Sequence, residues 1–465
     1  MKTLDTVKAG GENDYVIRVL DSPLEVPAAQ WNALLWLQPD ANPFMRHEYL
    51  AALHESGSAT PKTGWTPRFV TLWQKGTTSP DAELVAACAL YLKDHSYGEY
   101  VFDHAWANAY HQHGLAYYPK ALIAPPFTPV PGARLLAINA ATRLALVKAL
   151  VQWCGEEDLS SLHLLFASDV DVAACEDAGL MLRHNVQFHW KNVAPTLVAA
   201  RPLLPPEGAE LAWGGPALRS APTPGAAPGP ERPFSSFDDF LMSLSQDKRK
   251  KIRQERRKVA DAGVTFRWSL GKDISSADWD FFYSCYERTY YEHGNAPYLT
   301  RDFFHRMAAT MPENWLLFVG ERGGEPIATS LIAINTDMTR ANGTFDTKKE
   351  PKTTLEHVPE PAPQRIAYGR YWGATERVDC LHFEACYYQP LQWCIEHGFQ
   401  RFEGGAQGEH KMARALLPVR TSSAHWLADP VFTNAVDRFL AREETDIVSY
   451  LHVLAQHTPF KKNPL

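Results

Sequence analysis

Cysteine is scarce in this sequence, and its spacing excludes two kinds of structure. The seven cysteines are an odd number, and none of them lies in a C-x-x-C pair. A disulfide framework needs paired cysteines, so we expect free thiols in a reducing, cytoplasmic compartment. The missing pairs also remove the usual zinc-ligand spacing, so we predict no metal site.

An excess of positive charge is also absent. The formal net charge is -7, whereas a chain that binds nucleic acid over its whole surface usually carries a basic excess. We therefore expect no DNA partner, and any basic site must be local. The sequence also lacks a run of about 18 apolar residues, and residues 1–14 lack the apolar core of a signal peptide. These absences predict a cytoplasmic protein without a membrane span.

The sequence does contain enough apolar material for two domains. With 465 residues, of which 45% are hydrophobic, the chain is too long for one ordinary core. A tract rich in proline, glycine and alanine at 194–233 cannot bury enough apolar area to fold alone. We therefore expect a first domain at 1–193, this linker, and a second domain at 234–465 that carries a polar surface insertion at 336–364.

The two halves share an order of expected elements, in which early strands precede alternating helices and strands. In the first half the periodicity predicts strands at 68–73, 83–92, 117–124 and 162–167 and helices at 139–154 and 170–178. In the second half it predicts a hairpin of strands at 315–321 and 326–335, further strands at 365–374 and 399–402, and a helix after each of these two. The repeat predicts a mixed α/β (α+β) fold made of two similar units.

The segment 401–418, R-F-E-G-G-A-Q-G-E-H-K-M-A-R-A-L-L-P, concentrates chargeable side chains around glycines. Gly404 and Gly405 permit a tight turn and a close backbone approach. Residues 409–417 are expected to form a helix whose start faces this turn, which is an arrangement typical of binding sites. A solvated helix whose cations face water is the alternative.

A second polar segment precedes this one. Residues 381–398 read L-H-F-E-A-C-Y-Y-Q-P-L-Q-W-C-I-E-H-G, and Pro390 cannot lie inside a regular helix. We therefore expect the regular helix to begin near Gln389 and to end at Gly398. Glu384 then lies on a kinked entry segment, where irregular backbone exposes side chains.

Residues 237–260 are expected to form a strongly basic helix. Acids lie at its start and cations at its end, which suits the helix dipole. Eight lysines and arginines lie between Lys248 and Lys258, and this density indicates an anionic ligand nearby. A solvated face, partly neutralised by Asp247 and Glu255, is the alternative.

These motifs together resemble the FemAB-like group of predicted N-acyltransferases. The second-half motifs that carry the resemblance are S-L-S-Q-D-K-R-K-K-I-R-Q-E-R-R at 243–257, R-Y-W-G-A at 370–374, L-H-F-E-A-C-Y-Y-Q-P at 381–390 and G-A-Q-G-E-H-K-M-A-R at 405–414. The first-half segments that match the group are 108–110, 114–120 and 125–134. The resemblance implies two tandem GNAT-like acyltransferase domains, each a twisted mixed sheet flanked by helices, with the substrate site in or beside the second.

The resemblance also implies a reaction, the transfer of an acyl or aminoacyl group to an amine of a peptide or cell-wall precursor. The chain is similar to Fem aminoacyltransferases and, more distantly, to leucyl/phenylalanyl-tRNA protein transferases. It departs from ordinary GNAT proteins in their pyrophosphate loop, (Q/R)-x-x-G-x-(G/A), because residues 370–375 match only the first four places. The donor therefore stays open between acyl-CoA and aminoacyl-tRNA, each as a co-substrate rather than a tightly bound cofactor.

Amide formation from either donor needs a neutral amine, a stabilised oxyanion and a proton for the leaving group. The candidate catalytic residues are Glu384, Glu403 and His410 for the amine, Gln407 with the backbone amides of Gly405 and Gly408 for the oxyanion, and Tyr388 or Tyr387 for the leaving group. Structural roles are the alternatives, with Glu384 as an acid near a helix start, Glu403 paired with Lys411, and His410 as a core-facing or capping residue.

Phosphate contacts are expected from cations, since guanidinium groups bind phosphate bidentately. The candidates in the second half are Arg249, Arg253, Arg257, Lys411 and Arg414. In the first half, the residues expected to line a cleft that faces the second domain are Tyr118, Lys120 and Arg134.

Two further hypotheses concern a metal site and a non-catalytic function. Asp103, His104, His111 and His113 suggest a metal site, because His111 and His113 would share one face of a strand. Their aromatic neighbours favour a packed or substrate-lining strand instead. The alternative function is a non-catalytic protein that uses the basic helix to hold RNA or a phosphorylated glycan. tRNA is a candidate partner in either case.

Overall fold

The computed structural model describes residues 2–4, 15–74, 83–194, 232–335, 364–405 and 408–461. Apart from their end residues, the predicted linker 194–233 and the predicted insertion 336–364 therefore lie outside the described residues. Gln407 lies outside them as well. The predicted boundaries at 193 and 234 stay a prediction.

The first half begins with antiparallel strands and continues with alternating helices and strands. Its strands are β1 (Lys2–Leu4), β2 (Tyr15–Leu20), β3 (Trp65–Gln74), β4 (Leu84–Lys93), β5 (Lys120–Ile123), β6 (Leu136–Ala137), β7 (Ser161–Ala167) and β8 (Met181–Lys191). Its helices are α1 (Ala28–Trp36), α2 (His47–Glu55), α3 (His104–Gln112), α4 (Ala140–Glu156) and α5 (Asp169–Asp177). The first-half strands and helices predicted from periodicity are confirmed, with shifts only at their ends.

The second half repeats this order. Its strands are β9 (Val264–Leu270), β10 (Trp315–Arg322), β11 (Glu325–Asn335), β12 (Ile366–Ala374), β13 (Arg401–Glu403) and β14 (Leu417–Leu427). Its helices are α6 (Phe237–Ser243), α7 (Gln246–Asp261), α8 (Ser276–Glu292), α9 (Arg301–Thr310), α10 (Leu381–Phe383), α11 (Gln389–Glu396) and α12 (Pro430–Gln456). The predicted hairpin is formed by β10 and β11, and the helix expected to begin near Gln389 is α11.

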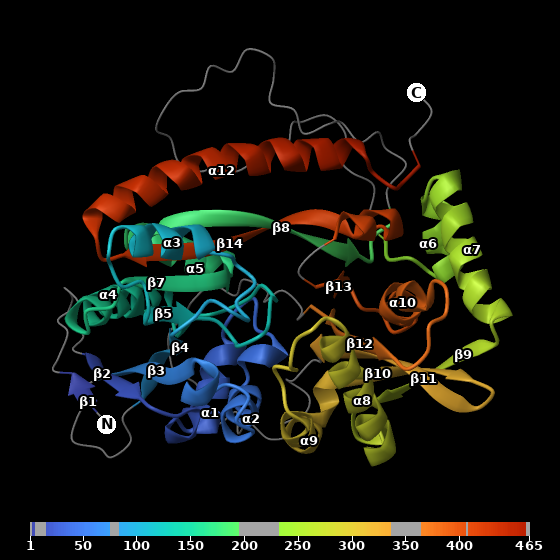
Figure 1. The fold of residues 1–465 in the computed structure, drawn as a ribbon, viewed down its shortest axis with the longest axis horizontal. Coiled ribbons are helices and arrows are strands. Elements are labelled where there is room, and N and C mark those ends of the chain that lie inside the picture. The colour runs from blue at the N-terminus through green and yellow to red at the C-terminus, as the bar shows by residue number, and fades with distance from the viewer. Residues whose placement is uncertain are drawn as a thin grey trace, which may run out of the picture.

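All described strands belong to one mixed sheet that extends through both halves (Figure 1). Its order is β1-β2-β3-β4-β5-β7-β14-β8-β13-β12-β11-β10-β9, with β6 paired to β4. Neighbouring strands are antiparallel except for two parallel pairs, β5 with β7 and β12 with β13. Helices flank the sheet, so the predicted mixed α/β class is confirmed.

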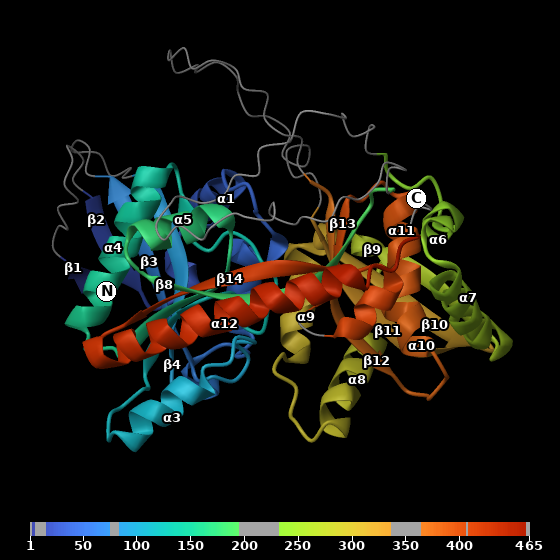
Figure 2. The ribbon, with the colours of Figure 1, turned by 90° about the horizontal axis from the view of Figure 1, so that it is seen from above.

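The last part of the chain completes the sheet of the first half. β14 pairs with β7 on one edge and with β8 on the other. α12 then packs against β8 and β14 and runs along both halves of the molecule (Figure 2). β8 also pairs with β13, so the two sequence halves share one sheet. Within the described ranges, no helix combines the length and apolarity that a bilayer crossing needs.

Local sequence explains why these elements form where they do. All seven residues of β7 are buried, as expected for a central strand that is covered on both faces. Several helices begin at a polar side chain that accepts a hydrogen bond from a backbone N–H of the first turn. Such caps are Asn139 before α4, Ser168 before α5 and Thr300 before α9.

Two helix predictions are wrong at their ends or middle. The expected helix at 409–417 is only a 3-10 segment, Glu409–Arg414, because from Leu417 the backbone pairs with β8 instead. The expected single helix at 237–260 is broken at Leu244, whose side chain is fully buried and whose backbone bridges to Phe460. Tertiary pairing overrides helix propensity at both places.

The expected strand around His111 and His113 is also wrong. His111 lies in α3, and His113 caps the C-terminal end of that helix. Both side chains are exposed. Among the described residues, no group of three or more metal-ligating side chains is placed to hold a metal ion.

A buried histidine pair joins β14 to β7. The Nδ1 atoms of His163 and His425 lie 2.8 Å apart. The Nε2 atom of His163 lies 2.8 Å from the hydroxyl oxygen of Ser161, and that of His425 lies 2.8 Å from the hydroxyl oxygen of Ser423. Burial lowers the pKa of His163 to about 3 and the pKa of His425 well below its ordinary value. Both rings therefore stay neutral in the folded protein near pH 7.

We expect the stability lost in His425→Gln to be smaller at acid pH than at neutral pH. In the unfolded chain His425 binds a proton below about pH 6.5, whereas the folded chain resists its protonation. Below this pH the contribution of His425 to the free energy of unfolding therefore falls by about 1.4 kcal/mol per pH unit. Urea unfolding should show the difference between wild type and variant shrinking by about 2–3 kcal/mol between neutral pH and about pH 4.5. The exposed His457 provides the control, His457→Gln. A difference that does not change with pH would contradict a buried neutral pair.

Candidate active site

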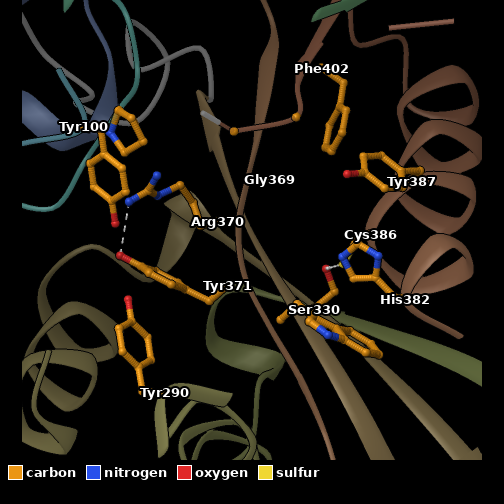
Figure 3. A pocket seen from close by; sticks show the side chains of 14 residues that line it. Tyr100, Tyr290, Ser330, Gly369, Arg370, Tyr371, His382, Cys386, Tyr387 and Phe402 are labelled. Carbon is orange, nitrogen blue, oxygen red and sulfur yellow. Dashed lines mark hydrogen bonds between the residues drawn. The ribbon is translucent and has the colours of Figure 1, made fainter. Parts of the chain in front are cut away.

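A cavity opens where two parallel strands of the second half separate. β12 pairs with β11 along its length but with β13 only at Ile366–Tyr368. Gly369–Trp372, which follow this point on β12, line a cavity of about 230 Å³ together with Phe402 of β13 and with Gly404 and Gly405 after it (Figure 3). One edge of β12 therefore faces the cavity with backbone groups that no described strand pairs.

Both sequence halves contribute to the cavity wall. Tyr100 and Pro129 come from the first half, Tyr290 comes from α8, and Ser330 comes from β11. None of the 14 lining residues is an aspartate or glutamate, and the lining guanidinium is that of Arg370. The cavity therefore presents phenols and one permanent positive charge.

A π turn at Glu384–Tyr388 brings further side chains to the wall. Such a widened turn re-aims side chains that a regular α-helix would direct elsewhere. Here Cys386 and Tyr387 of the turn line the cavity, as does His382 before it. Burial raises the pKa of the Cys386 thiol to about 12. Burial and nearby cations lower the pKa of His382 to about 4. Both groups are therefore uncharged near pH 7.

The hydroxyl of Tyr387 connects the cavity with the solvent side of the site. It lies 3.4 Å from Nε2 of the exposed His410, whose pKa is lowered by partial burial and by Arg414 and Lys411. Burial raises the pKa of Tyr387 above its ordinary value, so the phenol stays protonated. Next to this pair, Lys411 Nζ donates a 3.0 Å hydrogen bond to the carbonyl of Gly405, and burial lowers the pKa of Lys411 to about 8.

The segments that form this cavity match a known family. A sequence model of the FemAB-like family, described as peptidoglycan biosynthesis/recognition, matches residues 22–196, 230–341 and 362–462. The protein belongs to the FemAB-like family. The match includes every residue that lines the cavity and confirms the resemblance inferred from the sequence motifs. A search of curated proteins finds no match.

Several solved structures have a similar arrangement of elements. The C-terminal domain of a putative lysylphosphatidylglycerol synthetase from Agrobacterium fabrum is 9% identical, with a TM-score of 0.44 over 90% of this chain and 97% of that one. L-PGS from Bacillus licheniformis is 10% identical, with a TM-score of 0.44 over 90% and 97% of the two chains. A tandem GNAT protein from the clavulanic acid biosynthesis pathway is 12% identical, with a TM-score of 0.38 over 90% and 99%. These likenesses concern the arrangement of elements alone.

Two predicted catalytic residues of this FemAB-like protein, Glu384 and Tyr388, form hydrogen bonds within the protein and lie outside the cavity wall. The buried carboxylate of Glu384 accepts hydrogen bonds from Arg256 Nε at 3.1 Å and from Gln389 Nε2 at 2.7 Å. The hydroxyl of the fully buried Tyr388 donates to Glu255. Neither residue lines the cavity. Their geometry favours structural roles that tie α7 to the π turn.

Glu403 lies beside the cavity rather than in its wall. Its neighbour Phe402 faces the cavity, so the alternation of β13 directs Glu403 to the opposite face. Glu403 forms an ion pair with Arg401 at 3.1 Å, and its carboxylate oxygens have no hydrogen-bond partner among the described residues. Burial raises the pKa of Glu403 to about 7. The expected pairing with Lys411 is absent from the described contacts, since the Lys411 ammonium bonds to Gly405 instead.

The structure separates the predicted phosphate contacts into surface and buried cations. Arg249, Arg253 and Arg257 lie on α7, where Arg253 and Arg257 are exposed. Arg414 is only 2% exposed and Lys411 only 3%. The guanidinium of Arg414 is held by Glu255 at 2.9 Å, so neither buried cation presents a surface to a phosphate. The burial of Lys411 and Arg414 gives no support to their predicted phosphate contacts, which stay a prediction.

The first-half cations expected to line a cleft are also buried. Arg134 is fully buried, and its guanidinium donates to backbone carbonyls, including that of Leu165 at 2.9 Å. Lys120 is fully buried and donates to Glu99 at 2.7 Å and to Asp103. Tyr118 is half-buried beside this group. None of the three lines the cavity, and the Lys120 ammonium is paired with carboxylates of the first half.

Sequence reasoning missed the aromatic and cationic wall contributed by Arg370, Tyr371, Tyr100 and Tyr290. The R-Y-W-G motif was compared with a phosphate loop, but it lies inside β12 rather than before a helix. The available signal was a charged residue in an aromatic strand, since a cation at such a position needs a partner or a ligand. The contributions of Tyr100 and Tyr290 depend on tertiary structure.

Proposed function

We propose that this protein transfers an acyl or aminoacyl group from acyl-CoA or aminoacyl-tRNA to an amine of a peptide or cell-wall precursor. The cavity between β12 and β13 is the proposed site of transfer. The observation that carries the proposal is the separation of these parallel strands. An extended donor arm can lie along the open edge of β12 and form main-chain hydrogen bonds there, as an added strand would.

The chemistry requires two proton transfers besides the exchange of bonds. The neutral amine attacks the donor carbonyl, a C–N bond forms, and the bond from carbon to the thiol sulfur or ribose oxygen breaks. The nitrogen loses one proton and the leaving group gains one. The hydroxyl of Tyr387 and the imidazole of His410 form a pair that can pass a proton between the cavity and solvent. The backbone amide of Gly405, which lines the cavity, is the proposed oxyanion donor.

Donor binding tests the proposal directly. The protein is titrated with acetyl-CoA, longer acyl-CoAs and an aminoacyl-tRNA while its thermal unfolding is followed, because a ligand of the folded state raises the midpoint. The donor that stabilises the protein is then incubated with a peptide amine, and amide formation is measured. Stabilisation followed by transfer supports the proposal. Failure of every donor to bind, or binding without transfer to any amine, would count against it.

A second candidate function, a non-catalytic protein that holds RNA or a phosphorylated glycan, is supported by the surface of α7. Arg253, Arg256 and Lys258 have acidic partners. The α7 cations that lack an ion pair with any described residue are Lys248, Arg249, Lys250, Lys251 and Arg257. A patch of this kind binds phosphate backbones by counter-ion release.

We expect the double variant Lys250→Glu, Arg257→Glu to weaken binding of a short RNA strongly at low salt and little at high salt. Both residues are exposed and lie seven positions apart, on one face of α7. The reversal should lower affinity about tenfold or more at about 50 mM salt and less at about 300 mM, because ions screen exposed charges. Filter binding measures the effect, with Lys191→Glu, Lys272→Glu as a control of equal charge change. Equal losses in the two double variants would exclude a specific patch.

A further inference from the structure

The guanidinium of Arg370 lies in the cavity wall without a counter-charge. Its Nη2 atom donates to the backbone carbonyl of Phe127 at 2.9 Å and to the hydroxyl of Tyr371 at 3.3 Å. Its Nε atom is buried and has no hydrogen-bond partner among the described residues. The group also lies about 5 Å from the rings of Phe44 and Tyr371. The described residues therefore do not saturate the donors of this guanidinium, although Arg370 lines the cavity.

No acid in the cavity wall neutralises this charge. Among the described residues, Arg370 has no ion pair within 4.0 Å, whereas Arg46, Arg183 and Arg256 each bond to a glutamate. The side chains around the guanidinium are the phenols of Tyr49, Tyr100 and Tyr371. Removing a guanidinium from water costs free energy that a hydrogen-bonded anion offsets. The wall therefore has a positive charge that no lining carboxylate offsets, which favours an anionic ligand.

Phenol donors gather at the same place. Figure 3 shows the hydroxyl groups of Tyr100, Tyr371 and Tyr290 directed toward one another below the guanidinium. Burial raises the pKa of Tyr100 to about 12, so its hydroxyl stays a donor. Tyr100 and Phe127 both adopt left-handed backbone conformations, with φ of 63° and 57°. Such conformations are strained for residues other than glycine and persist where the surrounding structure fixes them. Here they place the Tyr100 ring in the wall and the Phe127 carbonyl on Arg370.

We propose that Arg370 and these tyrosines bind a carboxylate, the free carboxylate of an amino acid or short peptide that enters as the amine acceptor. One guanidinium matches one negative charge, and its planar donors fit a carboxylate. A phosphate dianion would need a second cation, but the imidazole of His382, across the cavity from Arg370 (Figure 3), is neutral near pH 7. The aromatic wall suits the apolar part of such a ligand. The identification of this ligand as the acceptor rests on the proposed transferase function, whereas its binding does not.

Paired fragments test the binding site without any donor. Benzoate and benzamide have the same shape and differ in charge, so each is titrated into the full-length protein while NMR line broadening of the fragment and thermal unfolding are followed. We expect benzoate to bind about tenfold or more tightly than benzamide, since a hydrogen bond to a charged group contributes more than one to a neutral group. Equal binding of the two fragments, or no binding of either, would overturn the proposal. Tighter binding of inorganic phosphate than of benzoate would overturn the carboxylate assignment.

Three variants test whether the preference for benzoate over benzamide depends on this site. Arg370→Gln should abolish the preference for benzoate, and Tyr100→Phe, which keeps the ring and removes the hydroxyl, should reduce it a few-fold. Arg365→Gln, at an exposed arginine just before the same strand, is the matched control and should keep the preference. If Arg370→Gln fails to fold, Tyr100→Phe alone decides the matter, and an unchanged preference there overturns the proposal. Carboxylate binding without any transfer would refute the transferase function but not this site. Transfer without a preference for carboxylates would refute this site but not the transferase function.

Discussion

Tyr387→Phe is expected to lower the rate of acyl transfer by about a hundredfold or more, which is the usual contribution of a positioned proton-transfer group. The substitution keeps the ring in the cavity wall and removes only the hydroxyl that contacts His410. Its measurement is a single-turnover transfer assay at saturating donor, so that binding effects are separated from the chemical step.

Two companion variants define this effect. His410→Gln should cost about tenfold, since His410 is exposed and water can take over its proton at that position. Tyr291→Phe removes the hydroxyl of an exposed tyrosine of α8, whose side chain is 59% exposed, and should leave the rate unchanged. A Tyr387→Phe protein that folds normally and transfers at the wild-type rate would remove Tyr387 from the chemistry.

Glu255→Leu is expected to destabilise the folded protein by about 3–5 kcal/mol, the cost of leaving a buried ionic partner unpaired. The carboxylate of Glu255 accepts from Arg414 Nη2 at 2.9 Å and from the hydroxyl of Tyr388. Arg414 also packs its guanidinium 3.6 Å from the ring centre of Phe383 and donates to the carbonyl of His410. One carboxylate on α7 therefore fixes both segments that carry the proposed proton pathway.

Urea unfolding measures this loss, and the neighbouring position supplies the control. Gln254→Leu makes the same change at an exposed residue of α7 and should alter stability by no more than about 0.5 kcal/mol. The double variant Glu255→Leu, Arg414→Leu should recover part of the loss, because it removes the unpaired charge. A loss below about 1 kcal/mol for Glu255→Leu would show that Arg414 finds water or another partner.

The sequence predicts most local elements of this fold but not their long-range pairing. β4, β7 and α4 have strong periodic or apolar patterns, and they form within a few residues of the expected positions. The order of strands depends on contacts far apart in the sequence. Nothing local in Leu417–Leu427 indicates that β14 inserts between β7 and β8. Its pairing from Leu417 onward stops the helix that was expected at 409–417.

The site is predictable at the level of segments rather than of side chains. The glycine turn, the segment around Glu384 and the R-Y-W-G strand all meet at the cavity, as their unusual composition suggested. Within these segments the direction of each side chain decides its role, and that direction depends on the π turn and on the pairing of β13. Glu384 and Arg414 therefore form internal ion pairs, while Arg370 faces the cavity.

A crystal structure of the protein with its stabilising donor bound tests the proposed site of transfer. We expect the donor carbonyl in the cavity between Gly369–Trp372 and Gly404–Gly405, within reach of the Tyr387 hydroxyl, with the donor arm along the open edge of β12. A donor bound elsewhere, with this cavity empty, would contradict it.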